Sequence, residues 1–413
     1  MRERVILHCD LNGFFAGVEC LLNPALNAGP MAVCGDPARR HGIILAKNEE
    51  AKKYGIITAE TVWQAKRKCP TLTLVQPHHE AYAEYSKLCN EIYYSYTDLV
   101  EPFGIDESWL DVTGSQHLFG SGVQIADSIR QTVREQTGLS VSVGVSYNKI
   151  FAKLGSDYKK PDATTVISRE NFRAVVHPLP VEALLFVGRR AKKALADMGI
   201  NTIGALASYD RSILSHKMGS AGALIHDYAN GLDVAPVLPF HEQPEIKSVG
   251  NGTTFAQDLC GLAQLEPAVF MLCDEVTSRM RRRNLRAATL QVSIKDANFT
   301  SIQRQKPFDK PSCSAREFCA LAMAIIKETP YASRAVRALR VTASNLVDKD
   351  AVFTQTSLFA APIDTDKQDK IDSTVDKIRD RYGTQTIQYG TGFQKKENGG
   401  DSEDNDLYRT IDN

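Results

Sequence analysis

The sequence GIDESWLDV at residues 104–112 reads as two short extended segments around a tight turn, and it carries two adjacent carboxylates, Asp106 and Glu107. A second strand pattern lies near the N-terminus, where apolar side chains at residues 5–9 alternate as in a half-buried strand and Asp10 follows at its end. If the hairpin lies beside this strand, three carboxylates meet at one edge of a sheet. Acidic residues are common at turns, so ordinary surface charge is the alternative interpretation.

The segments that follow build one unit around this strand. Helical spacing covers residues 80–96 and 124–136, an alternating strand covers 140–145, and a further helix covers 148–158. The order strand–helix–strand–strand–helix–strand is that of the ferredoxin-like split βαβ arrangement. Residues 13–79 stand as a long insert within it. The pattern therefore predicts an α+β fold.

The chain changes character several times beyond residue 168. Residues 169–238 form a small helical unit, prolines mark a linker at 239–246, and residues 247–350 form a mixed α/β unit. Residues 351–413 contain a short motif, a charged helix at 364–382 and an acidic tail that is too poor in apolar residues to fold alone. We expect that helix to pack through one apolar face made of Ile371, Val375 and Ile378.

Composition and charge exclude several protein classes. Apolar residues make up 43% and charged residues 24% of the chain, as in ordinary globular proteins. No apolar run is long enough to cross a membrane, and the N-terminal residues lack the apolar segment of a signal peptide. The nine scattered cysteines include no CxxC pair, which indicates a reducing cytoplasm. The net charge of zero hides a basic region at 240–350 and an acidic tail at 361–413.

Three motifs carry the functional information: CDLNGFFAGVE at residues 9–19, GIDESWLD at 104–111, and SVGVSYNK at 142–149 with Ala152-Lys153 and Lys160-Pro161 after it. In this order and at this spacing, they resemble the three motifs of the Y-family, DinB/UmuC-type DNA polymerases. The resemblance extends over roughly residues 4 to 390, and bacterial DNA polymerase IV is the most similar subgroup. Each motif alone is moderate evidence for this resemblance, and the three together are strong evidence.

The resemblance implies a multi-domain right-hand polymerase. Its parts would be a ferredoxin-like palm, small fingers, a helical thumb with a helix-hairpin-helix, and an α/β little finger. On this chain they correspond to palm 1–12 and 80–168, fingers 13–79, thumb 169–238, linker 239–246, little finger 247–350, and a C-terminal segment 351–413.

The resemblance also assigns the carboxylates. Asp10, Asp106 and Glu107 would bind two Mg²⁺ ions, or Mn²⁺ in their place, and the carbonyl of Leu11 would add a backbone ligand. Two ions a few ångströms apart activate a hydroxyl and stabilise the leaving oxygen of an in-line displacement. Mg²⁺ prefers oxygen ligands and keeps several waters, so few carboxylates suffice.

Five further residues would bind the incoming nucleotide. Phe15 occupies the steric-gate position, where an aromatic ring leaves no room for a ribose 2′-hydroxyl. Backbone amides near Gly13 and Phe14 begin a helix and can hold phosphate oxygens, and Lys52 and Lys160 would contact the triphosphate as point charges. An isolated phenylalanine is more often a core residue, and Lys160 read alone is a solvated lysine.

The chain departs from the family pattern at several positions. Many members have an acidic residue where this chain has Asn12, and many have Asn-Tyr-Glu-Ala-Arg where residues 48–52 read NEEAK. Lys52 keeps the positive charge of the arginine but loses its bidentate geometry. We expect Glu49 to turn away from the triphosphate and Lys47 or Lys52 to supply the missing contact.

Two basic segments and one peptide motif point to macromolecular partners. The basic segments at residues 188–192 and 281–286 can each neutralise phosphates of primer-template DNA without reading its sequence. For the segment at 188–192, a solvated basic helix is the alternative interpretation. QTSLF at residues 355–359 resembles the peptide that binds the bacterial sliding clamp. The assigned residues are Gly188, Arg189, Arg190 and Lys192, then Arg281, Arg282, Arg283 and Arg286 for DNA, and Gln355, Leu358 and Phe359 for the clamp.

The sequence predicts a monomeric, cytoplasmic bacterial enzyme that uses dNTPs and associates with the nucleoid when it acts. Three other functions share some of its features. A non-catalytic scaffold of the same superfamily would bind DNA and clamp but typically lacks the carboxylates. A palm-type cyclase would have no use for the basic segments, and a nucleic-acid-binding module would have none for the carboxylates.

Overall fold

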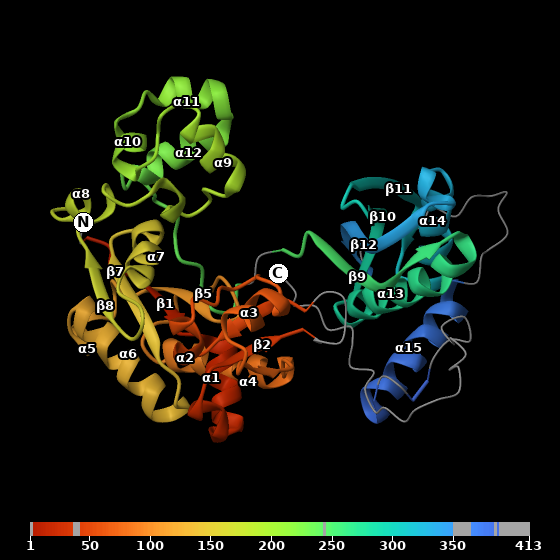
Figure 1. Cartoon of the computed structure of the whole chain (residues 1–413), viewed down its shortest axis with the longest axis horizontal. Coiled ribbons are helices and arrows are strands. Elements are labelled where there is room, and N and C mark those ends of the chain that lie inside the picture. Colours follow the sequence, from red (N-terminus) through yellow and green to blue (C-terminus); the bar gives the residue numbers. More distant parts are fainter. Residues whose placement is uncertain (1–2, 36–41, 243–244, 350–364, 384–385, 388–413) are drawn as a thin grey trace. The chain divides into compact units, whose positions relative to one another are not determined.

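The structure is a computed structural model that describes residues 3–35, 42–242, 245–349, 365–383 and 386–387 (Figure 1). It contains two compact units, Met1–Gln243 and Pro244–Asn413. Each unit has cores of its own, so each is described by itself.

The sheet that carries the carboxylates has the strand order β5-β6-β1-β7-β8. Its central strand β1 (Ile6–Leu11) pairs antiparallel with β6 (Glu107–Asp111) and with β7 (Val141–Ser146). β5 (Val100–Pro102) forms one edge, and β8 (Thr164–Ile167) runs parallel to β7 at the other. The first, second, third and fourth strands of the ferredoxin-like pattern are β1, β5, β6 and β7. The predicted fold is confirmed, with β8 as an added strand.

Helices cover both faces of this sheet. Tyr82 and Ile92 of α4 (His79–Tyr94) and Ile125 of α6 (Gly122–Thr137) share a buried core with β1. On the opposite face lies α7 (Lys149–Tyr158), which begins at an Asn148 cap. The hairpin turn falls at residues 103–106, and short α5 (Gln116–Phe119) precedes α6.

The predicted insert forms a small α/β layer. Its sheet has the order β3-β2-β4, and a separate buried core lies beneath it. Helix α1 joins the two layers, because Phe14 and Val18 pack into the core of the large sheet while Ala16 and Cys20 pack against β2. The elements are α1 (Phe14–Leu22), η1 (Pro24–Ala28), β2 (Met31–Cys34), β3 (Ile44–Lys47), α2 (Glu49–Lys53), α3 (Val62–Lys68) and β4 (Thr73–Val75).

The helical unit packs on the far side of α7, whose Phe151 and Leu154 belong to its core. The first residues of the predicted linker, 239–246, pack against the large sheet and its helix α4. The amide of Phe240 donates to the carbonyl of Asp98 at 3.0 Å, and the Phe240 ring packs on Tyr94. The helices are α8 (Phe172–Val176), η2 (Val181–Ala183), α9 (Arg189–Ala196), α10 (Ile203–Ser208), α11 (Arg211–Met218) and α12 (Ser220–Ala229).

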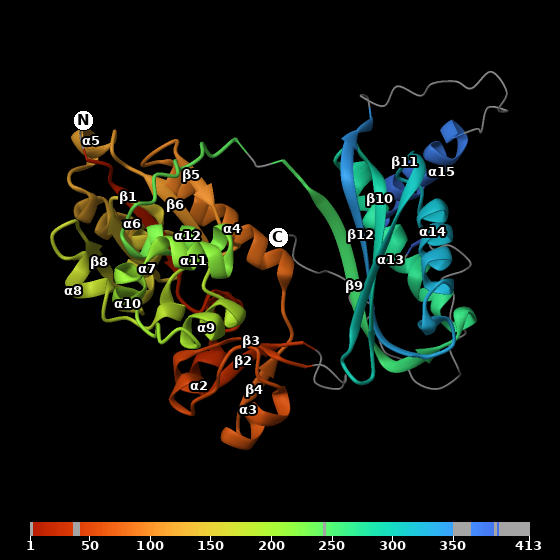
Figure 2. The same cartoon turned by 90° about the horizontal axis from the view of Figure 1, so that it is seen from above.

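The second unit is a four-stranded antiparallel sheet with helices on one face (Figure 2). Its strand order is β11-β10-β12-β9, and its core lies between the sheet and helices α13 and α14. The elements are β9 (Ser248–Cys260), α13 (Leu262–Arg282), β10 (Leu285–Asp296), β11 (Ser301–Ser312), α14 (Ala315–Lys327), η3 (Pro330–Ala332), β12 (Ala335–Asp348) and α15 (Thr365–Tyr382).

Helix α15 lies where the sequence predicts a charged helix, but its packed face differs from the prediction. Ile371 is 43% exposed, whereas Asp372 and Asp376 are buried beside Val375. The expectation of an apolar face is therefore wrong for Ile371. Ion pairs to α13, described below, replace much of the expected apolar contact.

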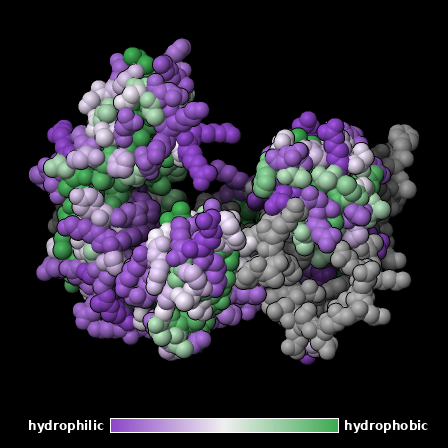
Figure 3. Space-filling model, in the orientation of Figure 1, coloured by the Kyte–Doolittle hydropathy of each residue, from purple (hydrophilic) through white to green (hydrophobic). Residues whose placement is uncertain are grey.

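Some predicted features lie outside the described residues: the clamp-like motif Gln355, Leu358 and Phe359, and the acidic tail from residue 388 onward. On the coloured surface in Figure 3, hydrophilic and apolar side chains are mixed. Among the described helices, none is long and apolar enough to cross a membrane.

Candidate active site

Strand pairing brings the three predicted carboxylates together. Asp10 lies opposite Glu107 in the antiparallel register of β1 and β6. The amide of Leu11 donates to the carbonyl of Asp106 at 2.9 Å, which ties the turn before β6 to the end of β1. The side chains at these positions therefore share one end of the sheet.

Helix α7 approaches this end of the sheet unusually closely. Gly144 of β7 allows it, because a Cβ atom there would lie 1.9 Å from the carbonyl oxygen of Ala152. Gly155 faces the same contact, where an added Cβ would lie 2.9 Å from the Cα of Gly144. Backbone packed on backbone places the next polar residues of α7 directly against the carboxylates.

Two lysines reach the carboxylates from α7 and the segment after it. The Nζ atom of Lys153 lies 3.0 Å from Asp10 Oδ2 and 2.5 Å from Glu107 Oε2. Lys160 Nζ lies 2.8 Å from Asp10 Oδ1 and 2.7 Å from Asp157. The motif containing Lys153 was identified from the sequence, but this role of Lys153 was missed.

The carboxylates have unequal proton affinities. Burial, together with the neighbouring charges of Asp10 and Glu107, raises the pKa of Asp106 to about 6. Burial alone would also raise the pKa of Glu107, but the hydrogen bond from Lys153 and the nearby His8 ring outweigh it and lower that pKa to about 2. Three acidic groups in one partly buried place repel each other unless a cation lies among them.

This donor set fits divalent cations. Ligand atoms of His8, Asp10 and Glu107 lie within 4.8 Å of one another, and Asp106 adds a further carboxylate at the same turn. The ammonium of Lys153 bridges two of these carboxylates, so positive charge already stands between them. Carboxylate oxygens such as those of Asp10, Asp106 and Glu107 are the ligands that Mg²⁺ prefers.

Phe15 lies in an aromatic cluster at the start of α1. Its ring stacks on Tyr82, with the centroids 4.2 Å apart and the planes 11° from parallel, and His79 meets it edge-on. The Tyr82 hydroxyl donates to the buried carboxylate of Glu19. Phe14 is almost fully buried in the core. Phe14 is therefore the more buried of the two neighbouring phenylalanines, although both rings lie against Tyr82.

The start of α1 shows how the departure at Asn12 is accommodated. The Asn12 amide donates to Ser140 Oγ at 3.2 Å, and the Ser142 hydroxyl donates to the Asn12 side-chain oxygen at 2.9 Å. These bonds hold Asn12 against β7. Gly13 follows with φ 56°, a left-handed conformation that favours glycine and opens α1.

The NEEAK segment at residues 48–52 forms most of helix α2, and its oppositely charged side chains pair with each other. Lys52 Nζ lies 2.5 Å from Glu49 Oε1, and Lys47 Nζ donates to Thr58 Oγ1 at 3.1 Å. The structure thus pairs Glu49 with Lys52. Both side chains of this pair are well exposed, so the pair is weak and a triphosphate can compete for the lysine.

The two basic segments have contrasting surroundings. Gly188 caps α9, and Arg189 and Arg190 are exposed there. Lys192 pairs with Glu182 at 2.6 Å on the surface. Charge at this helix start is therefore available to an anion such as a phosphate.

The arginines at the end of α13 contact other parts of the same unit. Arg281 is nearly buried and donates to Asp376 Oδ2 of α15 at 2.6 Å and to the carbonyl of Cys313 at 2.9 Å. Arg282 pairs with Asp380 at 2.5 Å. Arg286 donates to the carbonyl of Pro311 at 3.4 Å. A guanidinium surrounded by carboxylates is a poor phosphate ligand until those carboxylates leave.

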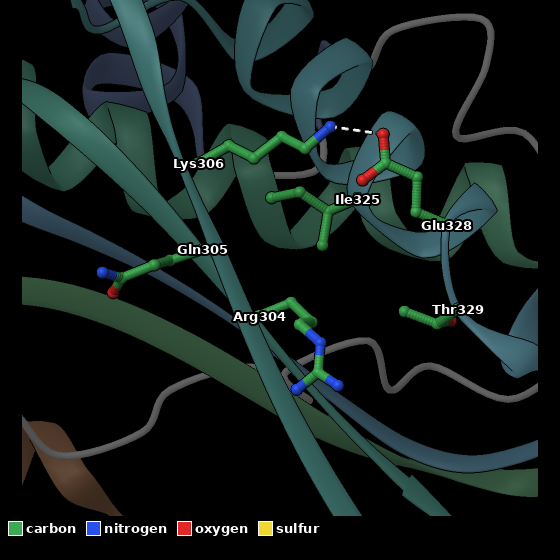
Figure 4. A pocket seen from close by; sticks show the side chains of 6 residues that line it. All are labelled: Arg304, Gln305, Lys306, Ile325, Glu328 and Thr329. Carbon is green, nitrogen blue, oxygen red and sulfur yellow. Dashed lines mark hydrogen bonds and ion pairs between the residues drawn. The ribbon is translucent and has the colours of Figure 1, made fainter.

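A small pocket lies far from the carboxylates in the chain, between β11 and α14 (Figure 4). Arg304, Ile325 and Thr329 line it, and Lys306 Nζ at its rim lies 2.5 Å from Glu328 Oε1. It holds one carboxylate, already paired, and so lacks the acidic cluster that metal-dependent chemistry needs.

Comparison with known proteins agrees with this site. The model of the impB/mucB/samB family matches residues 9–157, and that of its C-terminal domain matches residues 246–358. A protein named DNA polymerase IV from Acetivibrio thermocellus is 45% identical over 95% of this chain and 98% of its own length. A protein of the same name from Clostridium kluyveri is 35% identical over 96% of this chain and all of its own length. The chain belongs to the Y-family DNA polymerases.

The fold agrees with a solved member of this family. A Y-family DNA polymerase chimera superimposes with a TM-score of 0.76 at 24% identity, covering 83% of this chain and 99% of the chimera. This likeness supports the fold alone. The Y-family motifs occur at the strand ends, the α1 start and α7, which are the elements that build the carboxylate site.

Proposed function

We propose that the chain is a template-directed DNA polymerase that adds dNTPs to a primer 3′-hydroxyl in low-fidelity translesion synthesis and DNA repair. The observation that carries this proposal is the meeting of Asp10, Asp106 and Glu107 at one end of the sheet, with lysine charge between them. Relatives named DNA polymerase IV, aligned over nearly their full lengths, support it.

The acidic site would hold two Mg²⁺ ions, with Mn²⁺ as a substitute. Such ions activate the attacking hydroxyl and stabilise the leaving oxygen. Asp10, Asp106 and Glu107 are their proposed ligands, and the Leu11 carbonyl is a fourth. The high pKa of Asp106 reflects negative charge that a cation would neutralise.

The incoming nucleotide would lie between α1 and the lysines. Backbone amides of Gly13 and Phe14 and the ammonium of Lys160 would neutralise its phosphates, with Lys52 as a further cation once it leaves Glu49. Phe15 would exclude a ribose 2′-hydroxyl by contact. Its stacking on Tyr82 gives the Phe15 ring little freedom to move aside.

DNA would bind to both units. In the first, Gly188, Arg189, Arg190 and Lys192 at the start of α9 form a sequence-independent phosphate contact. In the second, we assign Arg281 a structural role because it is bound to Asp376. Arg282, whose pair is exposed, and Arg283 and Arg286 remain candidates.

The face of the second sheet that points away from its described helices is a candidate for an additional DNA surface. Alternation along β10, β11 and β12 places neutral polar side chains and Arg340 on the face away from the helices. Such a surface meets phosphates without repelling them. The residues at its centre are Gln291, Ser293, Gln303, Gln305, Arg340 and Thr342, and none of these six is acidic.

The domain boundaries and the remaining partners are also proposals. The palm would comprise residues 1–12 and 80–168, the fingers 13–79, the thumb 169–238 and the little finger 247–350. The sliding clamp would bind Gln355, Leu358 and Phe359. We propose a monomer that acts in the cytoplasm at the nucleoid.

Primer extension tests the enzymatic proposal. With Mg²⁺, dNTPs and a primed template, wild-type protein should extend the primer, and Asp106→Ala should lower the rate roughly a thousand-fold. Glu84→Ala removes an exposed carboxylate of α4 and should extend normally. Absence of extension by the wild type would exclude the enzyme and favour a DNA- and clamp-binding scaffold.

A further inference from the structure

A buried histidine lies directly behind the carboxylates. His8 is on β1, two residues before Asp10, so both side chains project from the same face of the sheet. It is fully buried. Its Nδ1 atom lies 2.8 Å from Ser156 Oγ on α7, and its Nε2 atom lies 3.4 Å from Glu107 Oε2.

The second ring nitrogen is unusual for a core histidine. Among the residues that the structure describes, Nε2 has no hydrogen-bond partner of ordinary geometry, although it is completely shielded from water. Buried polar atoms without a partner are uncommon and costly. The nearest acceptor is a carboxylate oxygen of the active site, so a small rotation of Glu107 would complete the bond.

Ser156 and Glu107 contact the two ring nitrogens of His8, and together they decide which nitrogen carries the hydrogen. Its hydroxyl has one hydrogen and two neighbours at 2.8 Å, the His8 Nδ1 atom and the carbonyl of Lys153. If Ser156 donates to Nδ1, the hydrogen of the ring lies on Nε2 and points at the carboxylate of Glu107. In the other arrangement a bare Nε2 lone pair of the neutral ring would face that carboxylate, which is repulsive. The carboxylate of Glu107, 3.4 Å from Nε2, therefore favours the tautomer that carries its hydrogen on Nε2.

We propose that His8, oriented by Ser156, is a positioning residue that holds Glu107 in the orientation needed to bind metal. Lys153 donates to the same Oε2 atom at 2.5 Å. If Lys153 turns toward a triphosphate, His8 remains as the donor that keeps Oε2 in place and leaves Oε1 free. This inference rests on the proposed polymerase function for its catalytic readout only.

Packing around the ring supports a fixed orientation. Trp109, directly opposite His8 on β6, meets the imidazole edge-on with centroids 5.3 Å apart. The Trp109 indole is itself held by a hydrogen bond from Nε1 to the carbonyl of Lys149 at 3.0 Å. The imidazole thus has an aromatic wall on one side, a hydroxyl behind it and the Glu107 carboxylate in front.

Three variants test the proposal: His8→Leu, His8→Gln and Ser156→Ala. His8→Leu removes the donor, and we expect Mn²⁺ binding to the free protein, measured by electron paramagnetic resonance, to weaken by roughly 10–100-fold. The Mg²⁺ concentration for half-maximal primer extension should rise and kcat should fall, while the KM for dNTP stays within about twofold.

The other two variants separate positioning from simple packing. His8→Gln keeps an N–H at about the position of Nε2 and should recover most of the Mn²⁺ affinity. Ser156→Ala should weaken Mn²⁺ binding less than His8→Leu does and should have no added effect in the His8→Leu background, because the two act in one chain of hydrogen bonds.

Thr165→Val is the matched control, because it removes another buried polar atom of the same sheet, on β8, that has no hydrogen-bond partner within the described part of the chain. It should leave Mn²⁺ affinity unchanged. The inference is wrong if His8→Leu lowers the Tm but binds Mn²⁺ like the wild type, or if His8→Gln is no better than His8→Leu. If His8→Leu does not fold, His8→Gln and Ser156→Ala decide. Mn²⁺ binding without any primer extension by the wild type would count against the polymerase function instead.

Discussion

At the scale of single residues, the site depends on side chains whose neighbours limit their freedom. Phe15 is held by a stacked Tyr82, and Tyr82 is held by a carboxylate, Glu19, that is buried. In the proposed nucleotide site, a ring held in this way would discriminate by shape, since it could not yield to an extra hydroxyl without disturbing a packed core.

Phe15→Ala should remove this discrimination. We expect ribonucleotide incorporation, relative to deoxyribonucleotide, to rise by at least about 10-fold in single-nucleotide primer extension, because a steric clash is removed. Phe14→Leu alters the adjacent core phenylalanine and should lower the Tm without changing the ratio. If Phe15→Ala excludes ribonucleotides as well as the wild type does, Phe15 is not the steric gate.

Acid should weaken metal binding through Asp106. Its pKa is raised to about 6, so the ionised carboxylate predominates above that pH and the protonated, non-ligating form below it. Glu107, with a pKa of about 2, stays ionised throughout this range. The Mn²⁺ dissociation constant of the free protein should therefore increase as the pH falls from about 7.5 to about 5.5. A dissociation constant that is flat across this range would argue against Asp106 as a ligand.

At the scale of elements, charged contacts connect helices that the sequence separates widely. Helix α15 is attached to α13 by the buried pair of Arg281 with Asp376, and Arg379 of α15 lies 2.8 Å from Asp274 of α13. The Ser278 hydroxyl also donates to Asp376 at 2.9 Å. Because these groups are buried together, each satisfies a charge or hydrogen bond that would otherwise be costly.

Asp376→Ala should release α15. Removing one partner leaves the Arg281 guanidinium buried without its main counter-charge, which costs on the order of 3 kcal/mol. Urea denaturation should show the loss of stability, and limited proteolysis should cut α15 faster. Asp380→Ala breaks the exposed pair with Arg282 and should cost less than about 1 kcal/mol. Equal effects of the two variants would show that burial of the Arg281 pair does not matter.

The start of α9 should contribute to DNA affinity in a salt-dependent way. Replacing both Arg189 and Arg190 by alanine should weaken primer-template binding. The slope of log Kd against log salt should fall by up to about 0.9 for each phosphate that the variant no longer neutralises. Lys87→Ala, an exposed lysine on α4, is the charge control. Fluorescence anisotropy at several salt concentrations measures both quantities, and an unchanged slope would exclude α9 as a phosphate-binding element.

At the scale of the whole molecule, each of the two units contains one large sheet with packed helices, and the two sheets share the same order of strands and helices along the chain. Both large sheets follow strand–helix–strand–strand–helix–strand, yet their strand orders differ. In the first, the opening strand β1 lies in the interior of the sheet, where its end can meet β6 and form a site. In the second, the opening strand β9 lies at an edge and the closing strand β12 lies inside.

Local patterns in the sequence predicted the element types and placed Asp10, Asp106 and Glu107 at strand ends that the structure brings together. They suffice because strand alternation, helix spacing and the Y-family motifs each involve residues close together in the chain. The ferredoxin-like order followed from them, and so did the placement of Asp10 beside Glu107.

Only the tertiary structure decided which side chains face the carboxylates. His8 and Ser156 are 148 positions apart, and Arg281 and Asp376 are 95 apart, so no local pattern pairs them. Close packing of Gly144 on α7 brought Lys153 and Ser156 to the site, and tertiary packing pairs Arg281, a predicted DNA ligand, with Asp376. The physical reason is that burial and hydrogen-bond partners depend on three-dimensional contacts, which one-dimensional spacing does not specify.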